Sequence, residues 1–168
     1  IKMNDYVVIL FYKFIDLADP AAFAMQHKEK CRELNILGRM IVAEEGINGT
    51  FEGKRSDIEK YKEFLKSDIR FKDILIKESK GTGMAFPKLK VKVRNEVVTL
   101  GAGRFNVAEE TAKELPVSDL KKWYENDEDF VVLDLRNDYE IASGKFEKTI
   151  DPGLANFRDL PSKIKDLE

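Results

Sequence analysis

Short apolar segments separated by polar turns follow one another through the first hundred residues of the chain. β-Branched and aromatic residues run through 7–14 (VVILFYKF), which predicts a buried strand. Asp19 and Pro20 then supply an N-cap and a first turn for a helix that extends to about Asn35, with Gly38 as its terminator. Four residues recur on one face of this helix: Phe23, His27, Cys31 and Leu34. We expect that face to pack against a sheet, with the lone histidine and cysteine as buried packing residues.

Two further strands, 39–44 and 47–53, are predicted to form a hairpin because glycine-containing turn signals lie between them. Asn48-Gly49 is a strong hairpin signal, and Glu45-Gly46 competes with it for the turn position. Glycines beside an asparagine can also expose backbone N–H groups, so the segment 44–50 is a candidate anion-binding concavity. A tight hairpin is the simpler explanation of the same residues.

A second helix and two more strands complete the predicted first domain. Ser56 and Glu59 form a capping box at the start of the helix. The remaining strands are predicted over 74–77 and 89–93, and the glycine-containing loop 79–86 is the expected mobile segment. The order βαββαβ predicts an α+β ferredoxin-like fold in which two helices cover one face of an antiparallel sheet.

The apolar periodicity stops after Gly101 and returns near Ser118. We therefore predict a first domain over 1–100, a linker over 101–116, and a second region over 117–168. The second region contains a nearly continuous apolar strand, which is typical of a parallel sheet covered on both faces. The whole chain, at 168 residues, exceeds one ordinary domain but is short for two complete ones, so we expect the second domain to be incomplete.

Composition limits the classes of function that remain. The chain has 29 Lys+Arg and 31 Asp+Glu, so the protein as a whole is not polyanion-seeking and any nucleic-acid site must be local. A single cysteine excludes an intrachain disulfide framework and is typical of a reducing compartment, which predicts a cytoplasmic location. Apolar runs stay well below the roughly 18 residues of a membrane span, so no membrane partner is expected.

A local site of positive charge is present in the last strand of the first domain. Four cations alternate there with apolar residues: Lys88, Lys90, Lys92 and Arg94. In a strand this spacing places the cations on one face while the apolar residues enter the core. Such a stripe can follow a phosphate backbone with salt-sensitive binding, and a solvated edge strand protected by lysines explains it equally well. Arg39 and Asn48 are further candidates for RNA contacts.

The second region contributes one polar pair of interest. Asp134 and Arg136 flank Leu135 at the end of the predicted parallel strand, at the edge where α/β sheets place their ligand sites. An ion pair that anchors the following loop is the alternative role for these two residues.

Four segments together resemble one bacterial family: YKFIDLADPAAF, GRMIVAEEGINGTFEG, VKVRNEVVTLG and VVLDLRNDYEIASGKFE. Its members carry a ferredoxin-like (acylphosphatase-like) N-terminal domain before a rhodanese domain, and they include the oxygen-dependent tRNA uridine hydroxylases that make 5-hydroxyuridine at the wobble position. The resemblance implies that the reactive cysteine lies in a rhodanese loop beyond Glu168, so no catalytic position is assigned within the chain. Asp134 and Arg136 match the Asp and Arg of the family's rhodanese strand.

The same resemblance sets the expected partners. It implies tRNA as the substrate and molecular oxygen as the co-substrate, and it implies no DNA partner. The residues present contain no recognisable metal site or nucleotide-binding glycine motif, so no further cofactor is expected.

These observations leave three hypotheses for the function of the protein. In the first, the parent protein is an oxidoreductase that modifies tRNA, with the first domain holding the RNA and this fragment inactive by itself. The second is a rhodanese-type sulfurtransferase. The third is a non-catalytic interaction module whose sheet edge pairs with a partner. The sequence assigns no oligomeric state.

Overall fold

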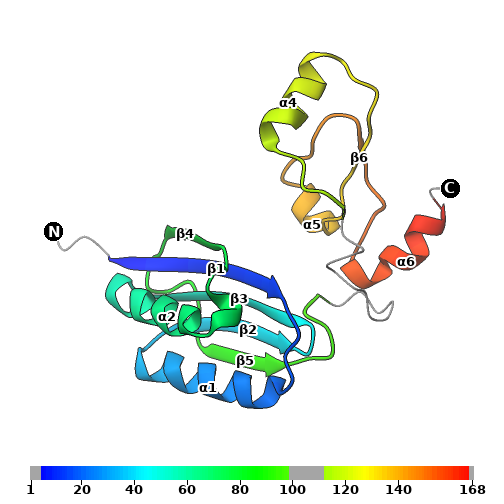
Figure 1. Ribbon diagram of the computed structural model, residues 1–168. Helices are drawn as coiled ribbons and strands as arrows, with labels where there is room; N and C mark the ends of the chain where they lie inside the picture. Colours follow the sequence, from blue (N-terminus) through cyan, green and yellow to red (C-terminus); the bar gives the residue numbers. More distant parts are fainter. Residues whose placement is uncertain (1–4, 99–111, 167–168) are drawn as a thin grey trace. The chain divides into compact units, whose positions relative to one another are not determined.

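The computed structural model describes residues 5–98 and 112–166 of the chain (Figure 1). The chain divides into two compact units, Ile1–Val97 and Val98–Glu168. Most of the predicted linker, 101–116, lies outside the described residues, so its prediction stands as made.

The first unit alternates strands and helices. Its elements are β1 (Tyr6–Phe14), α1 (Pro20–Glu33), β2 (Leu37–Ala43), β3 (Gly46–Lys54), α2 (Arg55–Ser67), the 3-10 helix η1 (Ile69–Phe71), β4 (Ile76–Lys80) and β5 (Leu89–Val93). The strands form one sheet in the order β4-β1-β3-β2-β5. The predicted α+β ferredoxin-like arrangement is confirmed from β1 to β4.

The fifth strand corrects the prediction of an antiparallel sheet. β5 joins the edge opposite β4 and pairs with β2 in parallel register, so the sheet is mixed. The position of β5 depends on the connection after β4. Because β4 already pairs with the free side of β1, the chain crosses one end of the sheet and then runs alongside β2.

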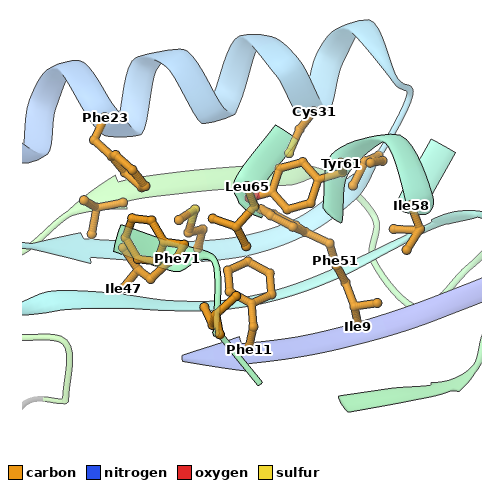
Figure 2. Packing of buried hydrophobic residues seen from close by; sticks show 14 of the residues in the cluster. Ile9, Phe11, Phe23, Cys31, Ile47, Phe51, Ile58, Tyr61, Leu65 and Phe71 are labelled. Carbon is orange, nitrogen blue, oxygen red and sulfur yellow. The ribbon is translucent and has the colours of Figure 1, made fainter. Parts of the chain in front are cut away.

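One face of the sheet packs against both helices of this unit. Figure 2 shows α1 passing over the apolar side chains of the strands, with Phe51 and Tyr61 at the centre of the cluster. Their rings meet edge-on with centroids 5.2 Å apart. The predicted face of α1 is confirmed, because Phe23, His27, Cys31 and Leu34 are all buried. This helix-covered face is the hydrophobic core of the unit.

The two reactive side chains of α1 are packing residues, as expected. His27 stacks on the Phe23 ring with centroids 4.1 Å apart, and its Nδ1 lies 2.9 Å from the Tyr61 hydroxyl. Burial lowers the pKa of His27 to about 4 and raises the pKa of the Cys31 thiol to about 12. At neutral pH both groups are therefore uncharged, which disfavours roles as a proton donor or a thiolate nucleophile.

The predicted hairpin is confirmed, with its turn at Glu44–Glu45. The turn signal at Asn48-Gly49 is therefore wrong, and the competing signal at Glu45-Gly46 lies one residue beyond the observed turn. Ala43 pairs with Gly46, and Asn48-Gly49 lies inside β3, which pairs with β1 and β2 on its two sides. Gly49 faces Phe11, whose ring occupies the space that a Cβ at this position would need. Close packing therefore outweighs the local turn preference. The pairing also disfavours the candidate anion-binding concavity over 44–50, because most of that backbone forms hydrogen bonds with β1 and β2.

The first helix ends differently from the prediction. Asp19 caps it as expected, accepting the Ala22 N–H at 2.9 Å. The helix stops at Glu33, and Asn35 takes the left-handed conformation with φ of 52°. Gly38, the predicted terminator, is instead a residue of β2. An asparagine tolerates this conformation nearly as well as a glycine, so the earlier residue ends the helix.

Two other boundaries also differ. α2 begins at Arg55 with Lys54 as its N-cap, which makes no side-chain capping bond, so the predicted capping box at Ser56 is absent. β4 begins at Ile76 rather than at Ile74, because Ile74 is buried in the turn that follows η1.

The second unit is smaller in its regular structure. Its elements are α4 (Val117–Glu125), β6 (Val132–Leu133), α5 (Asp138–Ile141), β7 (Thr149–Ile150), η2 (Phe157–Asp159), α6 (Leu160–Lys163) and η3 (Ile164–Asp166). β6 and β7 pair in parallel, as the apolar run through 130–135 predicts, although the strand itself covers two residues of that run.

Candidate nucleic-acid interface

The side of the sheet away from α1 and α2 carries a mixture of apolar, amide and cationic side chains. Because side chains alternate along a strand, each residue on this side of the sheet is adjacent in sequence to a residue that faces the helices. Phe11 is 1% exposed on the helix-covered face, whereas Tyr12 is 55% exposed on the other. Alternation along the strand lets one of these two adjacent aromatic residues reach the surface, and in the structure it is Tyr12.

Strand register assembles these side chains into two rows, which together we call the open face. The first row crosses β1, β3, β2 and β5 as Tyr12, Asn48, Ile41 and Lys92. The second row crosses the same strands as Leu10, Thr50, Arg39 and Lys90. Each row thus begins with an apolar or aromatic side chain on β1 and ends with a cation on β5.

The structure brings most of the predicted cationic candidates together. Arg39 pairs with Lys90 in the parallel register of β2 and β5, and Lys92 follows on the same side. Lys88 and Arg94 flank the strand and continue its backbone pairing: the Gly38 N–H approaches the Lys88 carbonyl oxygen at 3.4 Å, and the Arg94 N–H donates to Val42 at 2.9 Å. Of the three apolar residues between them, Leu89 and Val91 pack against the core, as the alternation predicts. Val93 is 47% exposed, so the prediction is wrong for this residue at the end of the strand.

These cations carry charge that the protein does not neutralise. Some other lysines in the first unit are held by carboxylates, as in the 2.5 Å contacts of Lys13 with Asp73 and of Lys62 with Glu78. Within the described part of the chain, no side-chain hydrogen bond or ion pair engages the five cations of this strand pair: Arg39, Lys88, Lys90, Lys92 and Arg94. Their charge is available to a ligand.

A single carboxylate lies among the strand residues on this side of the sheet, all of which the structure describes. Glu52 is 3% exposed and accepts three backbone hydrogen bonds, from Thr82 at 2.7 Å and from Gly83 and Ala85 at 2.8 Å each. Its charge is therefore offset by peptide dipoles, and the open face keeps a positive balance. These bonds also tie down the loop 79–86 that we expected to be mobile.

Sequence reasoning missed Glu52. The only signal for it is a carboxylate placed among apolar strand neighbours, where a buried charge requires partners. A glycine-containing loop supplies those partners through free N–H groups, but it lies 30 residues away in the sequence.

Asn48 keeps a place in the candidate site, although for a different reason from the one predicted. It lies between Tyr12 and Ile41 in the first row and is half-buried. Its side-chain amide makes no hydrogen bond to another described residue. An amide carries both donors and an acceptor, so this group is available to bind a polar ligand over the sheet.

The polar pair of the second unit forms an ion pair. Arg136 Nη2 lies 2.7 Å from Asp134 Oδ2, and Arg136 Nε lies 3.0 Å from Asp134 Oδ1. These hydrogen bonds lower the pKa of the buried Asp134 carboxyl. Arg136 also donates to the Gly144 carbonyl at 2.8 Å, which joins the end of β6 to the following loop. The geometry favours the anchoring role over a ligand-binding role for this pair.

Other kinds of site find no support in the described residues. Across 5–98 and 112–166, no cluster of three or more His, Cys, Asp or Glu side chains is arranged to hold a metal ion. In the same residues, no helix has the length and apolar character needed to cross a membrane.

Comparisons with known proteins agree with the sequence resemblance. Proteins named tRNA uridine(34) hydroxylase from Staphylococcus carnosus and Cytophaga hutchinsonii are 42% and 39% identical to this chain, over 96% and 99% of its length. The chain covers 51% and 53% of those relatives, so it spans about half of their length. An acylphosphatase structure from Coxiella burnetii aligns over 52% of this chain and 92% of its own, with 12% identity and a TM-score of 0.36. The family described as the UPF0176 acylphosphatase like domain matches residues 6–97. The chain therefore belongs to that family.

Proposed function

We propose that the protein to which this chain belongs is an oxygen-dependent tRNA uridine hydroxylase, an oxidoreductase that converts the wobble uridine of tRNA to 5-hydroxyuridine in the cytoplasm. Support comes from the relatives of that name, which match nearly the whole chain. In this proposal molecular oxygen is the co-substrate. The catalytic cysteine belongs to a rhodanese-like domain that begins in the second unit and continues beyond Glu168, and the fragment alone has no turnover.

The first unit serves this reaction by positioning the RNA on its open face. The observation that carries this role is the set of unpaired cations that the register of β2 and β5 gathers on one side of the sheet, around Arg39, Lys90 and Lys92. The chain as a whole has a formal net charge of −2, so attraction to RNA must come from such a local surface. Phosphate contacts of this kind position a nucleic acid without reading its sequence.

The interaction-module hypothesis has one observation in its favour. β5 is an edge strand, and an exposed edge can pair with a strand of another protein. Its lysines oppose such pairing, because charged side chains on an edge protect it from a second strand. The sulfurtransferase hypothesis differs from hydroxylation in its need for oxygen, so product formation by the full-length protein under air and under anaerobic conditions separates the two.

The test of RNA positioning is tRNA binding by residues 1–168 across a salt series. The open-face variant is Arg39→Gln/Lys90→Gln/Lys92→Gln. The matched control removes three exposed cations from the helices and from the turn after η1: Arg32→Gln/Lys66→Gln/Lys72→Gln. Both variants change the net charge equally, so non-specific attraction to tRNA falls equally in the two.

We expect the open-face variant alone to lose affinity strongly. Its slope of log affinity against log salt should flatten by roughly two units, since each phosphate contact on a single strand contributes about 0.7. Equal losses in the two triple variants would show that only net charge matters. Absence of tRNA binding by the unaltered chain at low salt would place RNA recognition outside these residues.

A further inference from the structure

The open face has a chemical asymmetry that charge alone does not explain. Its cations lie on β2 and β5, whereas β1 presents three exposed apolar or aromatic side chains in succession, Leu10, Tyr12 and Phe14. β1 is not an edge strand, because it lies between β4 and β3. A contiguous exposed apolar strip inside a sheet marks an interaction surface rather than a protected edge.

Tyr12 is the most exposed residue of that strip and has an amide beside it. Its cross-strand partner is Asn48, whose side chain makes no hydrogen bond to another described residue. Directly opposed side chains in an antiparallel pair have Cβ atoms about 5 Å apart. A planar ring and an amide at that separation match the two parts of a nucleobase, its π-face and its hydrogen-bonding edge.

The distance to the cations suits a short strand of RNA. Three strand spacings, or about 14 Å, separate Tyr12 from Lys92 along the first row. A base over Tyr12 therefore leaves its own backbone and that of its neighbours within reach of Arg39, Lys90 and Lys92. The single carboxylate among the described strand residues of this side, Glu52, is already held by backbone N–H groups and does not repel that backbone strongly.

We infer that the open face binds an unpaired segment of RNA, with one base stacked on the Tyr12 ring and the Asn48 amide available to the edge of that base. This inference rests on the proposed function and specifies which form of RNA the face accepts. In an A-form duplex the base faces are stacked on one another, so a flat aromatic residue finds no partner there. Splayed, single-stranded bases offer a free face to an aromatic side chain.

The test compares binding of a single-stranded oligouridylate and of a blunt RNA duplex of equal length to residues 1–168. Tyr12→Leu keeps an apolar side chain without a ring, and Tyr12→Phe keeps the ring. Tyr139→Leu removes another exposed tyrosine, on α5, as the control. We expect Tyr12→Leu to weaken single-strand binding about tenfold, at an unchanged salt slope, since removal of one stacking aromatic residue costs roughly five- to 150-fold. Tyr12→Phe and Tyr139→Leu should bind as the unaltered chain does, and the duplex should not distinguish any of the variants.

A direct readout makes the test independent of whether the leucine variant folds. The ring proton resonances of Tyr12, assigned by their loss in Tyr12→Phe, should move upfield when oligouridylate is added to the unaltered chain, and duplex should leave them in place. Unmoved resonances at saturating oligouridylate, or equal losses of single-strand and duplex affinity in Tyr12→Leu, would overturn the inference. If the open-face charge variant then still lost tRNA binding, the proposed function would stand without it. Absence of RNA binding altogether would overturn both.

Discussion

The two faces of the first unit's sheet are built from the same strands, but their side chains have different roles. Along each strand, side chains that point to the helices alternate with side chains that point away from them. On the helix-covered face, Ile9, Phe11 and Phe51 are buried and hold the fold together. On the open face, the adjacent residues Leu10, Tyr12 and Thr50 remain at least partly exposed. A single strand therefore carries stability on one side and ligand chemistry on the other. Substitutions at neighbouring positions should have separable effects, and the following predictions test that separation.

The largest difference is expected between Phe51 and its neighbour Thr50. Phe51 is fully buried and contacts the rings of Phe11 and Tyr61, with centroids 5.7 and 5.2 Å away. Phe51→Ala should lower the free energy of unfolding by about 3–5 kcal/mol. Thr50→Ala, on the open face of the same strand, should change it by about 1 kcal/mol or less. Urea denaturation of both variants measures the difference, and similar losses would show that both faces are buried in solution.

His27 gives the helix-covered face a contribution to stability that depends on pH. Its folded-state pKa is about 4, below the ordinary value of 6.5, because burial disfavours the charged imidazole. Between these two pH values the imidazole is protonated in the unfolded chain but remains neutral in the folded chain. The free energy of unfolding therefore falls as the pH is lowered from about 6.5 to about 4. The shift corresponds to roughly 3 kcal/mol.

The measurement is urea denaturation at several pH values for the unaltered chain and for His27→Gln. The glutamine variant should be less stable at neutral pH and should show a shallower loss between pH 6.5 and pH 4. Parallel pH curves for the two proteins would mean that His27 is protonated in the folded state or exchanges readily with solvent.

Glu52 lies at the boundary of the comparison, since it is buried although it lies on the open side of the sheet. Glu52→Gln replaces one carboxylate oxygen with an NH₂ group that faces backbone donors from the loop containing Thr82, Gly83 and Ala85. We expect a loss of about 1.5–3 kcal/mol, the range for a hydrogen bond to a charged group. Hydrogen exchange at those three amides should accelerate more than at the core strands.

Glu59→Gln is the control for this prediction. Glu59 lies on α2 in an exposed pair with Lys62, at 3.0 Å, and such pairs contribute about 0–1 kcal/mol. Unchanged exchange at the three loop amides in Glu52→Gln would mean that the loop is held by other contacts.

The same comparison shows what the sequence predicts well. β1, β5 and the face of α1 follow from periodicity, and Asp19 follows from its capping chemistry, because each signal is contained within a few neighbouring residues. The alternation of cations with Leu89 and Val91 likewise places the stripe on one face before any pairing is known.

Features that depend on contacts distant in sequence could not be predicted in this way. Asn48-Gly49 reads locally as a turn, and only the Phe11 ring across the strand pair explains why a glycine is needed inside β3. Arg39 becomes a neighbour of Lys90 through the parallel register of β5, which depends on a crossover connection. The burial of Glu52 could be explained only once the loop that donates hydrogen bonds to its carboxylate was known. The sequence therefore predicted a stripe along one strand, with Arg39 and Asn48 as separate candidates, and the strand register places these residues on one surface that crosses four strands.

The smallest effect on stability, with a measurable effect on binding, is expected for Asn48→Asp. The side chain has nearly the same shape, lies half-buried between Tyr12 and Ile41, and makes no hydrogen bond within the described residues that would be lost. Nearby unpaired cations offset the new charge, so the free energy of unfolding should change by about 1 kcal/mol or less. RNA affinity at low salt should fall several-fold, because a carboxylate repels phosphates and accepts hydrogen bonds without donating any.

Asn126→Asp makes the same substitution at an exposed position, just after α4 in the second unit, and should leave RNA binding nearly unchanged. If the two substitutions weaken RNA binding equally, RNA does not bind preferentially at the open face.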